Sequence, residues 1–167
     1  GNFVQSAVFF ASTAILIIGG LVAALGASDK VLDAITALPF FSPTTHALWG
    51  LKVASAIAVY IYAFVKFIWA VRLANYSAIL FSAAPFNTGS FNDEYAVELA
   101  KMIGLFGLHF NQGLRANFFA LAILAWWINP YFFIASTAIV LYVLYRREFR
   151  SKSLQSVNRL KEIASKN

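Results

Sequence analysis

The chain opens with a long uncharged stretch, because residues 3–25 contain no Asp, Glu, Lys or Arg. A helix needs about 20 apolar residues to cross the roughly 30 Å hydrocarbon core of a bilayer, so this stretch predicts a membrane-spanning helix. The composition agrees, since 60% of the 167 residues are hydrophobic and 12% are charged, with a mean hydropathy of +0.71. Soluble domains are usually less apolar. We therefore predict an all-α integral membrane protein.

Apolar segments recur along the chain and predict four membrane crossings, at about 3–25, 47–72, 113–128 and 131–147. The second segment continues to Pro85, which is more than one crossing requires, and residues of mixed charge precede the third segment from 93 to 109. The second and third helices are therefore predicted to form a hairpin that extends beyond the membrane on the cytoplasmic side.

The connections between the predicted helices contain turn-forming residues. Pro39 and Pro43 predict an irregular loop over residues 26–46. Small and polar residues at 85–92 predict a turn between the second and third helices. Asn92 or Asp93 is expected to cap the helix that follows this turn.

Positive charge is concentrated at the C-terminal end. Seven of the 13 basic residues lie between Arg146 and Lys166, and after subtraction of the two acidic residues there this end carries +5 of the total +6. Basic residues favour the cytoplasmic side of a membrane. Placing the tail in the cytoplasm puts eleven basic residues inside and leaves Lys30 and Lys52 outside. The charge is therefore interpreted as a topology signal, with both ends of the sequence cytoplasmic and no nucleic-acid partner.

Two regions are predicted, a transmembrane helical domain over residues 1–150 and a basic tail over residues 151–167. Apolar residues recur every three positions in the tail, at Leu154, Val157, Leu160 and Ile163. This spacing is typical of an amphipathic surface helix, which could lie on anionic lipid at the cytoplasmic leaflet. A solvated tail that only sets the topology is the other interpretation.

Residues that carry catalysis or bind metals are scarce. Cys is absent, which excludes disulfides, thiolate nucleophiles and Cys-ligated metals. His46 and His109 are the two imidazoles, and the predicted threading places them at opposite faces, about 30 Å apart, so they cannot share one metal or haem. No carboxylate lies inside a predicted crossing, which also weakens proton-coupled transport. We predict a protein that is not an enzyme and has no metal or cofactor.

Polar residues are predicted to converge where the second and third helices meet the cytoplasmic headgroups. Arg72, Asn75 and Tyr76 have i, i+3, i+4 spacing on one helix, and Asn111 and Arg115 have i, i+4 spacing on the next. Ionisable groups at membrane depth are costly and are functional candidates for that reason.

The predicted site consists of Lys66, Arg72, Asn75, Asn111, Arg115 and Glu148. Because Glu148 can neutralise only one of the three cations, the site is predicted to bind an anion, with a lipid phosphate as the first candidate. The alternative is a structural network in which Asn75 and Asn111 join helices by hydrogen bonds.

These features favour an accessory, structural or lipid-binding subunit of a larger membrane complex. The expected partners are membrane lipids, anionic ones in particular, and other membrane-protein subunits or further copies of this chain. Gly19, Gly20, Gly104 and Gly107 would allow close packing at a subunit interface, although packing within the chain explains them equally well. The alternative function is a small-solute or anion transporter or channel with the three cations at its inner mouth.

Several short motifs occur in a fixed order over nearly the whole chain: Phe9-Phe10-Ala11-Ser12-Thr13, Lys66-Phe67, Arg72, Asn75-Tyr76, Phe110-Asn111, Gly113-Leu114-Arg115-Ala116 and Arg146-Arg147-Glu148-Phe149. This pattern resembles that of the domain-of-unknown-function 599 family. The resemblance implies a multi-pass protein of a bacterial inner (plasma) membrane, with a further hydrophobic helix before the first crossing seen here. It also implies that the candidate site belongs to the family pattern, and it implies no activity.

Overall fold

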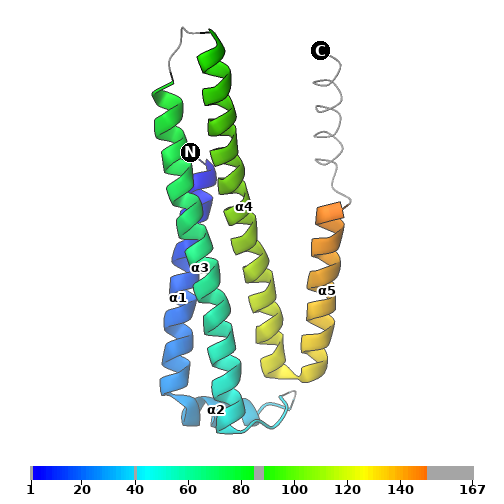
Figure 1. Ribbon diagram of the computed structural model, residues 1–167. Coiled ribbons are helices and arrows are strands. Elements are labelled where there is room, and N and C mark those ends of the chain that lie inside the picture. The colour runs from blue at the N-terminus through cyan, green and yellow to red at the C-terminus, as the bar shows by residue number, and fades with distance from the viewer. Residues whose placement is uncertain (1, 40, 85–88, 150–167) are drawn as a thin grey trace.

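The computed structural model describes residues 2–39, 41–84 and 89–149, and over these residues all the regular elements are α-helices. They are α1 (Asn2–Gly26), α2 (Ser28–Thr36), α3 (His46–Ser82), α4 (Gly89–Ile128) and α5 (Pro130–Phe149) (Figure 1). The prediction of an all-α fold is confirmed. The predicted surface helix at 151–167 lies outside the described residues.

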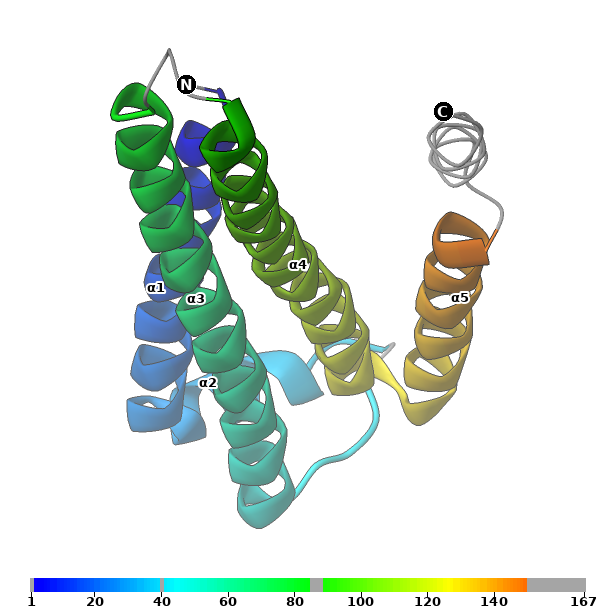
Figure 2. The same cartoon turned by 45° about the horizontal axis from the view of Figure 1, so that its top comes forward.

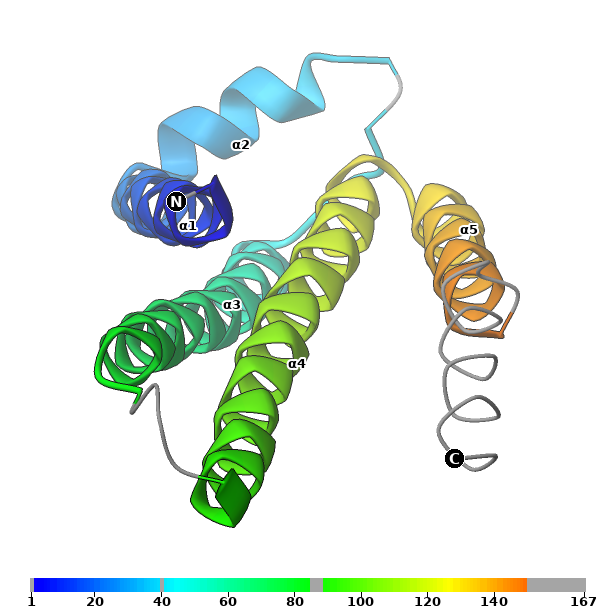
Figure 3. The same ribbon diagram turned by 90° about the horizontal axis from the view of Figure 1, so that it is seen from above.

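α3 lies at the centre of the bundle and packs against α1 and α4, whereas α5 packs against α4. Viewed from above, α5 stands on the far side of α4 from α1 (Figure 3). The short α2 lies across one end of the bundle and leads through a loop to the start of α3 (Figure 2). The two longest helices, α3 and α4, therefore pack directly against each other.

The buried interior is built largely from alanine. α1 contributes Ala7, Ala11 and Ala14, α3 contributes Ala56, Ala63 and Ala70, and α4 contributes Ala116, Ala120 and Ala122. Small residues let helix backbones approach closely, which is the usual means of packing helices when the surroundings are as apolar as the protein.

A tight contact between α3 and α4 occurs at Gly113. A Cβ added to Gly113 would lie 2.7–2.9 Å from three ring atoms of Phe67. Phe67 is fully buried, its ring stacks on Phe10 at a centroid distance of 5.3 Å, and Phe110 lies 5.8 Å away. A side chain at this position would therefore have to displace the Phe67 ring or one of the helices.

The prediction of an irregular loop over 26–46 was wrong in its first part, because α2 occupies Ser28–Thr36. Leu32 of this helix is buried, and Val31 and Ile35 pack against the same core, which is the spacing of one helical face. Asp29 in the first turn is favourable near the positive end of the helix dipole. The two prolines follow the helix and do not interrupt it.

The start of α4 also differs from the prediction. The helix begins at Gly89, so Asn92 and Asp93 lie within it and do not cap it. Tyr95 joins the two arms of the hairpin, since its hydroxyl donates to the Leu80 carbonyl at 2.6 Å. The ends of α3 and α4 near this connection extend beyond the N-terminal end of α1 (Figure 1).

Within the described part of the chain, two helices are long and apolar enough to cross a membrane, Val4–Gly26 and His46–Ser82. The first covers all but one residue of the crossing predicted at 3–25, and the second contains the crossing predicted at 47–72. A third apolar helix, Pro130–Arg146, is shorter. The crossings predicted at 113–128 and 131–147 stay predictions.

Candidate functional site

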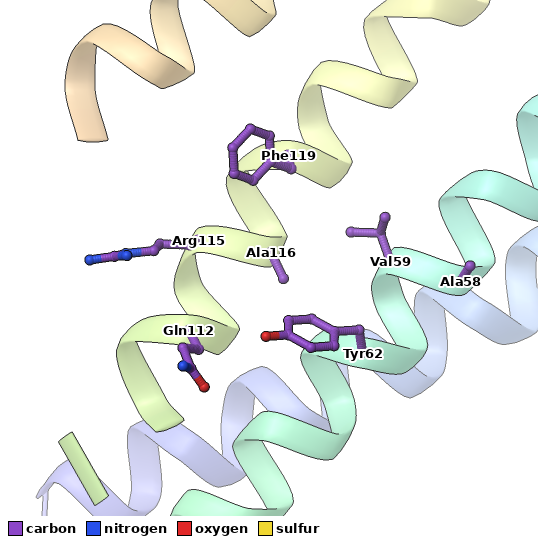
Figure 4. A pocket seen from close by; sticks show the side chains of 7 residues that line it. All are labelled: Ala58, Val59, Tyr62, Gln112, Arg115, Ala116 and Phe119. Atoms are coloured by element: carbon purple, nitrogen blue, oxygen red, sulfur yellow. The ribbon is translucent and has the colours of Figure 1, made fainter. Parts of the chain in front are cut away.

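An open groove of about 560 Å³ lies between α3 and α4. α3 contributes Ala58, Val59 and Tyr62, and α4 contributes Gln112, Arg115, Ala116 and Phe119 (Figure 4). The lining is mostly apolar, with three polar side chains near one end. Its volume is within the range of pockets that hold small molecules or parts of lipids.

The hollow results from the sizes of the lining residues. Ala58, Val59 and Ala116 are small, whereas Tyr62 and Phe119 form bulky walls. The Tyr62 ring points from α3 toward α4, and the Arg115 side chain extends from α4 away from α3 (Figure 4). Arg115 therefore lies at the rim of the groove.

Lys66 lies beside this groove. Its Nζ is 5.2 Å from the centre of the Tyr62 ring, one turn away on the same helix. An ammonium on a ring face gains a cation–π attraction that is stronger where water is excluded. Two predicted site residues, Lys66 and Arg115, are thus both associated with the groove, from opposite helices.

Arg72 lies farther along α3. It is six positions after Lys66, which corresponds to about 9 Å along the helix axis. Its Nε donates to the Tyr76 hydroxyl at 2.9 Å, and its guanidinium packs over the rings of Trp69 and Tyr76. The i, i+4 relation between Arg72 and Tyr76 that the spacing indicated is therefore a direct contact.

The remaining predicted site residues are distributed around this region. Asn75 is exposed on α3, beyond Arg72, and Asn111 is exposed on α4, four residues before Arg115. Glu148 belongs to α5, but its side chain lies outside the described residues. The structure associates Lys66 and Arg115 with one groove and places Arg72 and Asn75 one to three turns away from Lys66 on α3.

Two polar side chains of this region were not among the predicted site residues. Gln112 lines the groove, and its Oε1 is buried with no hydrogen-bond partner in the described part of the chain. His109 lies one turn earlier on α4, and its Nδ1 is also buried with no hydrogen-bond partner in the described part of the chain. Its ring is edge-on to the Trp69 ring, at a centroid distance of 6.4 Å. The signal in the sequence was the i, i+3 spacing of two polar residues directly before an apolar segment.

His109 lies before the third predicted crossing. Burial, together with the positive charge of Lys66, lowers the pKa of the His109 imidazole from its ordinary value. The imidazole is therefore neutral at pH 7 and can donate or accept a hydrogen bond. His46 lies at the other end of α3, where its Nδ1 is 3.5 Å from Asp29. Among the described residues, no three His, Asp or Glu side chains are grouped as metal ligands.

Lys52, Ser55, Tyr62, Lys66 and Trp69 follow one helical stripe along α3. Lys52 is buried, donates to Thr44 Oγ1 at 3.2 Å and lies over the Trp126 ring. Tyr62 and Trp69 are about half exposed. The stripe is therefore buried at Lys52, whereas Tyr62 and Trp69 lie at the groove and the surface.

The candidate site residues occur in motifs that span the chain, and comparison with protein families matches residues 1–153. The chain belongs to the DUF599 family. The description of this family is "Protein of unknown function, DUF599", so membership brings no activity with it. No curated protein and no solved structure matches the chain. The function has to be argued from the groove and the charges beside it.

Proposed function

We propose that this DUF599 protein is a non-catalytic, multi-pass membrane protein that binds an anionic phospholipid in the α3–α4 groove and acts as an accessory or structural subunit of a larger membrane complex. The observation that carries the proposal is the apolar groove with Arg115 at its rim and Lys66 beside it. An apolar hollow next to cations matches the two parts of a phospholipid, the acyl chain and the phosphate.

Exposed apolar side chains support the membrane assignment. Leu16 on α1 is 75% exposed, Leu51 on α3 is 59% exposed and Ile139 on α5 is 63% exposed. Water-soluble proteins rarely expose apolar surface on this scale, whereas lipid chains cover it at no cost. We place four crossings at 3–25, 47–72, 113–128 and 131–147, in a bacterial inner (plasma) membrane, with both ends of the sequence cytoplasmic.

The lengths of α3 and α4 fit this threading. α3 has 37 residues and α4 has 40. At 1.5 Å per residue both helices exceed 50 Å, so each is longer than the roughly 30 Å hydrocarbon core. With the loop before α3 outside, the hairpin extends into the cytoplasm and the groove cations come near the inner headgroups.

The charge balance supports a phosphate ligand. Glu148 is the acidic residue expected nearest to the groove, and it can neutralise only one of Lys66, Arg72 and Arg115. Arginine and lysine bind phosphate oxygens through charge-assisted hydrogen bonds, and the cytoplasmic leaflet supplies anionic headgroups.

The accessory role rests on helix faces that the fold leaves open. A Cβ added at Gly19, Gly20, Gly104 or Gly107 would meet no atom within 4 Å. Packing within the described chain therefore does not use these glycines, and a helix of another subunit or of a second copy could approach closely there.

Native mass spectrometry of the full chain tests lipid binding. The delipidated protein is titrated with phosphatidylglycerol and with phosphatidylcholine, which differ in net charge. Four variants are compared with the wild type. Lys66→Gln and Arg115→Gln remove the groove cations, and Ala58→Phe fills the groove at an exposed position without changing charge. Lys101→Gln is the matched control, because it removes a cation that pairs with Glu98 about 21 Å along α4 from Arg115.

We expect phosphatidylglycerol to bind more tightly than phosphatidylcholine and to be weakened by the three groove variants, with Lys101→Gln equal to the wild type. Equal binding of both lipids, or equal loss in Lys101→Gln, would contradict the proposal. Co-purification of other membrane subunits under gentle extraction supports the accessory role. Purification of the chain alone, with no other subunit and no lipid bound, refutes it. Anion flux through proteoliposomes that depends on Arg115 would favour the transporter alternative.

A further inference from the structure

One face of α4 packs on α5 near their shared turn and is exposed farther along. Trp126 of α4 meets the Phe133 ring of α5 at a centroid distance of 5.7 Å. Leu108 lies about five helical turns before Trp126 and Val97 about three turns before Leu108, so both lie on the face that Trp126 turns toward α5. Leu105 lies beside them, and all three side chains are about half exposed. Val97, Leu105 and Leu108 are called the α4 stripe below.

Lipid chains do not reach the far part of the α4 stripe. In the proposed threading α4 ends at the outer interface at Ile128, and Val97 is about 46 Å along the helix from that end. The hydrocarbon core is roughly 30 Å thick. Val97 therefore lies in the cytoplasm, where burying an apolar side chain against other protein is favourable.

The basic tail, residues 151–167, has the position and the length to cover the α4 stripe. In Figure 1, α5 runs from the shared turn toward the same end of the bundle as the start of α4. α5 is 20 residues long, about 30 Å, so its last residue, Phe149, is near the level of Leu108. As a helix the tail would extend about 25 Å farther, and Glu94 is about 21 Å beyond Leu108 on α4.

α5 and α4 diverge from their shared turn, so the chain has to bend toward α4 after Phe149 (Figure 2). Residues 150–153 span up to about 13 Å when extended, which is enough chain for such a bend. The apolar residues of the tail begin directly after this segment, at Leu154.

The chemistry of the two surfaces is complementary. Apolar residues in the tail recur at the spacing of one helical face, at Leu154, Val157, Leu160 and Ile163. The tail has four basic residues and one acidic residue, a net charge of +3, whereas residues 73–109 of the hairpin have three acidic residues and one basic residue, a net charge of −2. Glu94 is exposed one turn from Val97, and Lys101 is already paired with Glu98 at 2.6 Å.

We propose that the basic tail docks on the α4 stripe of its own chain and continues the packing of α5 on α4 into the cytoplasm. Docking buries the α4 stripe and brings the tail cations near Glu94. A tail that lay on anionic lipid would leave the stripe exposed to water. The inference goes beyond lipid binding in the groove and rests on one part of the proposed function, the threading that puts the hairpin and the tail on the same side.

Disulfide trapping in the full chain tests the docking, because the sequence contains no cysteine of its own. Leu160 is expected near the level of Val97, so the first pair is Val97→Cys/Leu160→Cys. The second pair, Leu108→Cys/Leu154→Cys, serves if the first is misaligned or does not fold. Leu51→Cys/Leu160→Cys is the matched control, because Leu51 is 59% exposed but lies near the outer end of α3.

The variants are reconstituted in phosphatidylcholine nanodiscs and oxidised. We expect both hairpin pairs to form disulfides within one chain at least about tenfold faster than the control pair, because docking raises the effective concentration of the two thiols. Adding Glu94→Gln to the first pair should slow the reaction by about 1.5- to fivefold, the effect of one exposed ion pair. Asp33→Asn, which removes an exposed acid on α2 at the other end of the bundle, should leave the rate unchanged.

Four results would overturn the proposal. Hairpin pairs that react no faster than the control pair show that the tail is not docked, and disulfides that join two copies assign the stripe to a dimer. Loss of the disulfides in nanodiscs that contain phosphatidylglycerol shows that the tail lies on the anionic membrane surface. Labelling of Val97→Cys and Leu160→Cys from opposite sides of a vesicle by an impermeant maleimide refutes the threading as well. The first three results leave lipid binding in the groove untouched, because that is measured separately with the Lys66 and Arg115 variants.

Discussion

Substituting Gly113 by alanine tests the packing that holds α3 against α4. The added methyl carbon would lie 2.7 Å from the nearest atom of the Phe67 ring, and ordinary contact begins at 3.4 Å, so the ring or a helix has to move by roughly 0.7 Å. The Phe67 ring cannot rotate away easily, because Phe10 stacks on it at 5.3 Å and Phe110 lies 5.8 Å away. Overpacking of this kind costs about 1–3 kcal/mol.

A matched variant separates this cost from the effect of alanine on the helix. Alanine in place of glycine stabilises a helix interior by about 0.5–1 kcal/mol. Gly107→Ala on the same helix receives this gain without a clash, since a Cβ there meets no atom within 4 Å. We therefore expect Gly113→Ala to be less stable than Gly107→Ala by about 1–3 kcal/mol, because the gain cancels in the comparison.

The free energy of unfolding is measured by SDS titration of the detergent-solubilised protein, followed by circular dichroism. The double variant Phe67→Ala/Gly113→Ala provides the second test. Removing the ring should destabilise the wild type more than it destabilises Gly113→Ala, because the clash is relieved at the same time. Equal stability of Gly113→Ala and Gly107→Ala, or strict additivity in the double variant, would refute the argument.

Three further predictions concern single hydrogen bonds, each measured by the same unfolding assay. Asn129→Ala should cost about 0.5–2 kcal/mol, because Asn129 Oδ1 accepts from Tyr131 N at 2.9 Å and caps α5, and Asn129→Asp should retain most of this stability. Tyr95→Phe should cost about 0.5–1.5 kcal/mol and speed amide hydrogen exchange near Leu80; unchanged exchange would count against the role of this bond in the hairpin. Thr44→Val should cost about 1.5–3 kcal/mol, since it removes the acceptor of the buried Lys52 ammonium, and no loss would show that another acceptor replaces Thr44.

The helical segments could be predicted from the sequence because hydrophobic runs and breaker residues act locally. The uncharged run at 3–25 and the apolar run from His46 both became helices, and Asn129-Pro130 separates α4 from α5. α2 was missed because Pro39 and Pro43 were given more weight than the helical spacing of Val31, Leu32 and Ile35, although both prolines lie after the helix. The beginning of α4 was misplaced because Asn92 and Asp93 are residue types that favour helix caps, whereas here they lie inside a helix that already begins at Gly89.

The candidate site could be predicted only in part, because spacing along one helix does not determine the register between two helices. The i, i+4 contact of Arg72 with Tyr76 follows from helix geometry alone. The association of Lys66 and Arg115 with one groove depends on the register of α3 against α4. The contact between Phe67 and Gly113 helps to fix this register. The i, i+3 spacing of His109 and Gln112 places both on one face of α4, but the burial of Gln112 beside the groove depends on how α3 packs against α4, and spacing on one helix does not give that.

Side-chain size explains both the tight contact and the groove beside it. Gly113 makes room for the Phe67 ring, and three residues farther along α4 Ala116 faces a hollow that Ala58 and Val59 also leave unfilled. A bulky residue at Ala58 would therefore close the groove and leave the Phe67 contact intact, whereas Gly113→Ala disturbs the contact. If Ala58→Phe loses lipid binding and keeps the stability of the wild type, the groove is not needed for folding. Its role is then to bind a ligand.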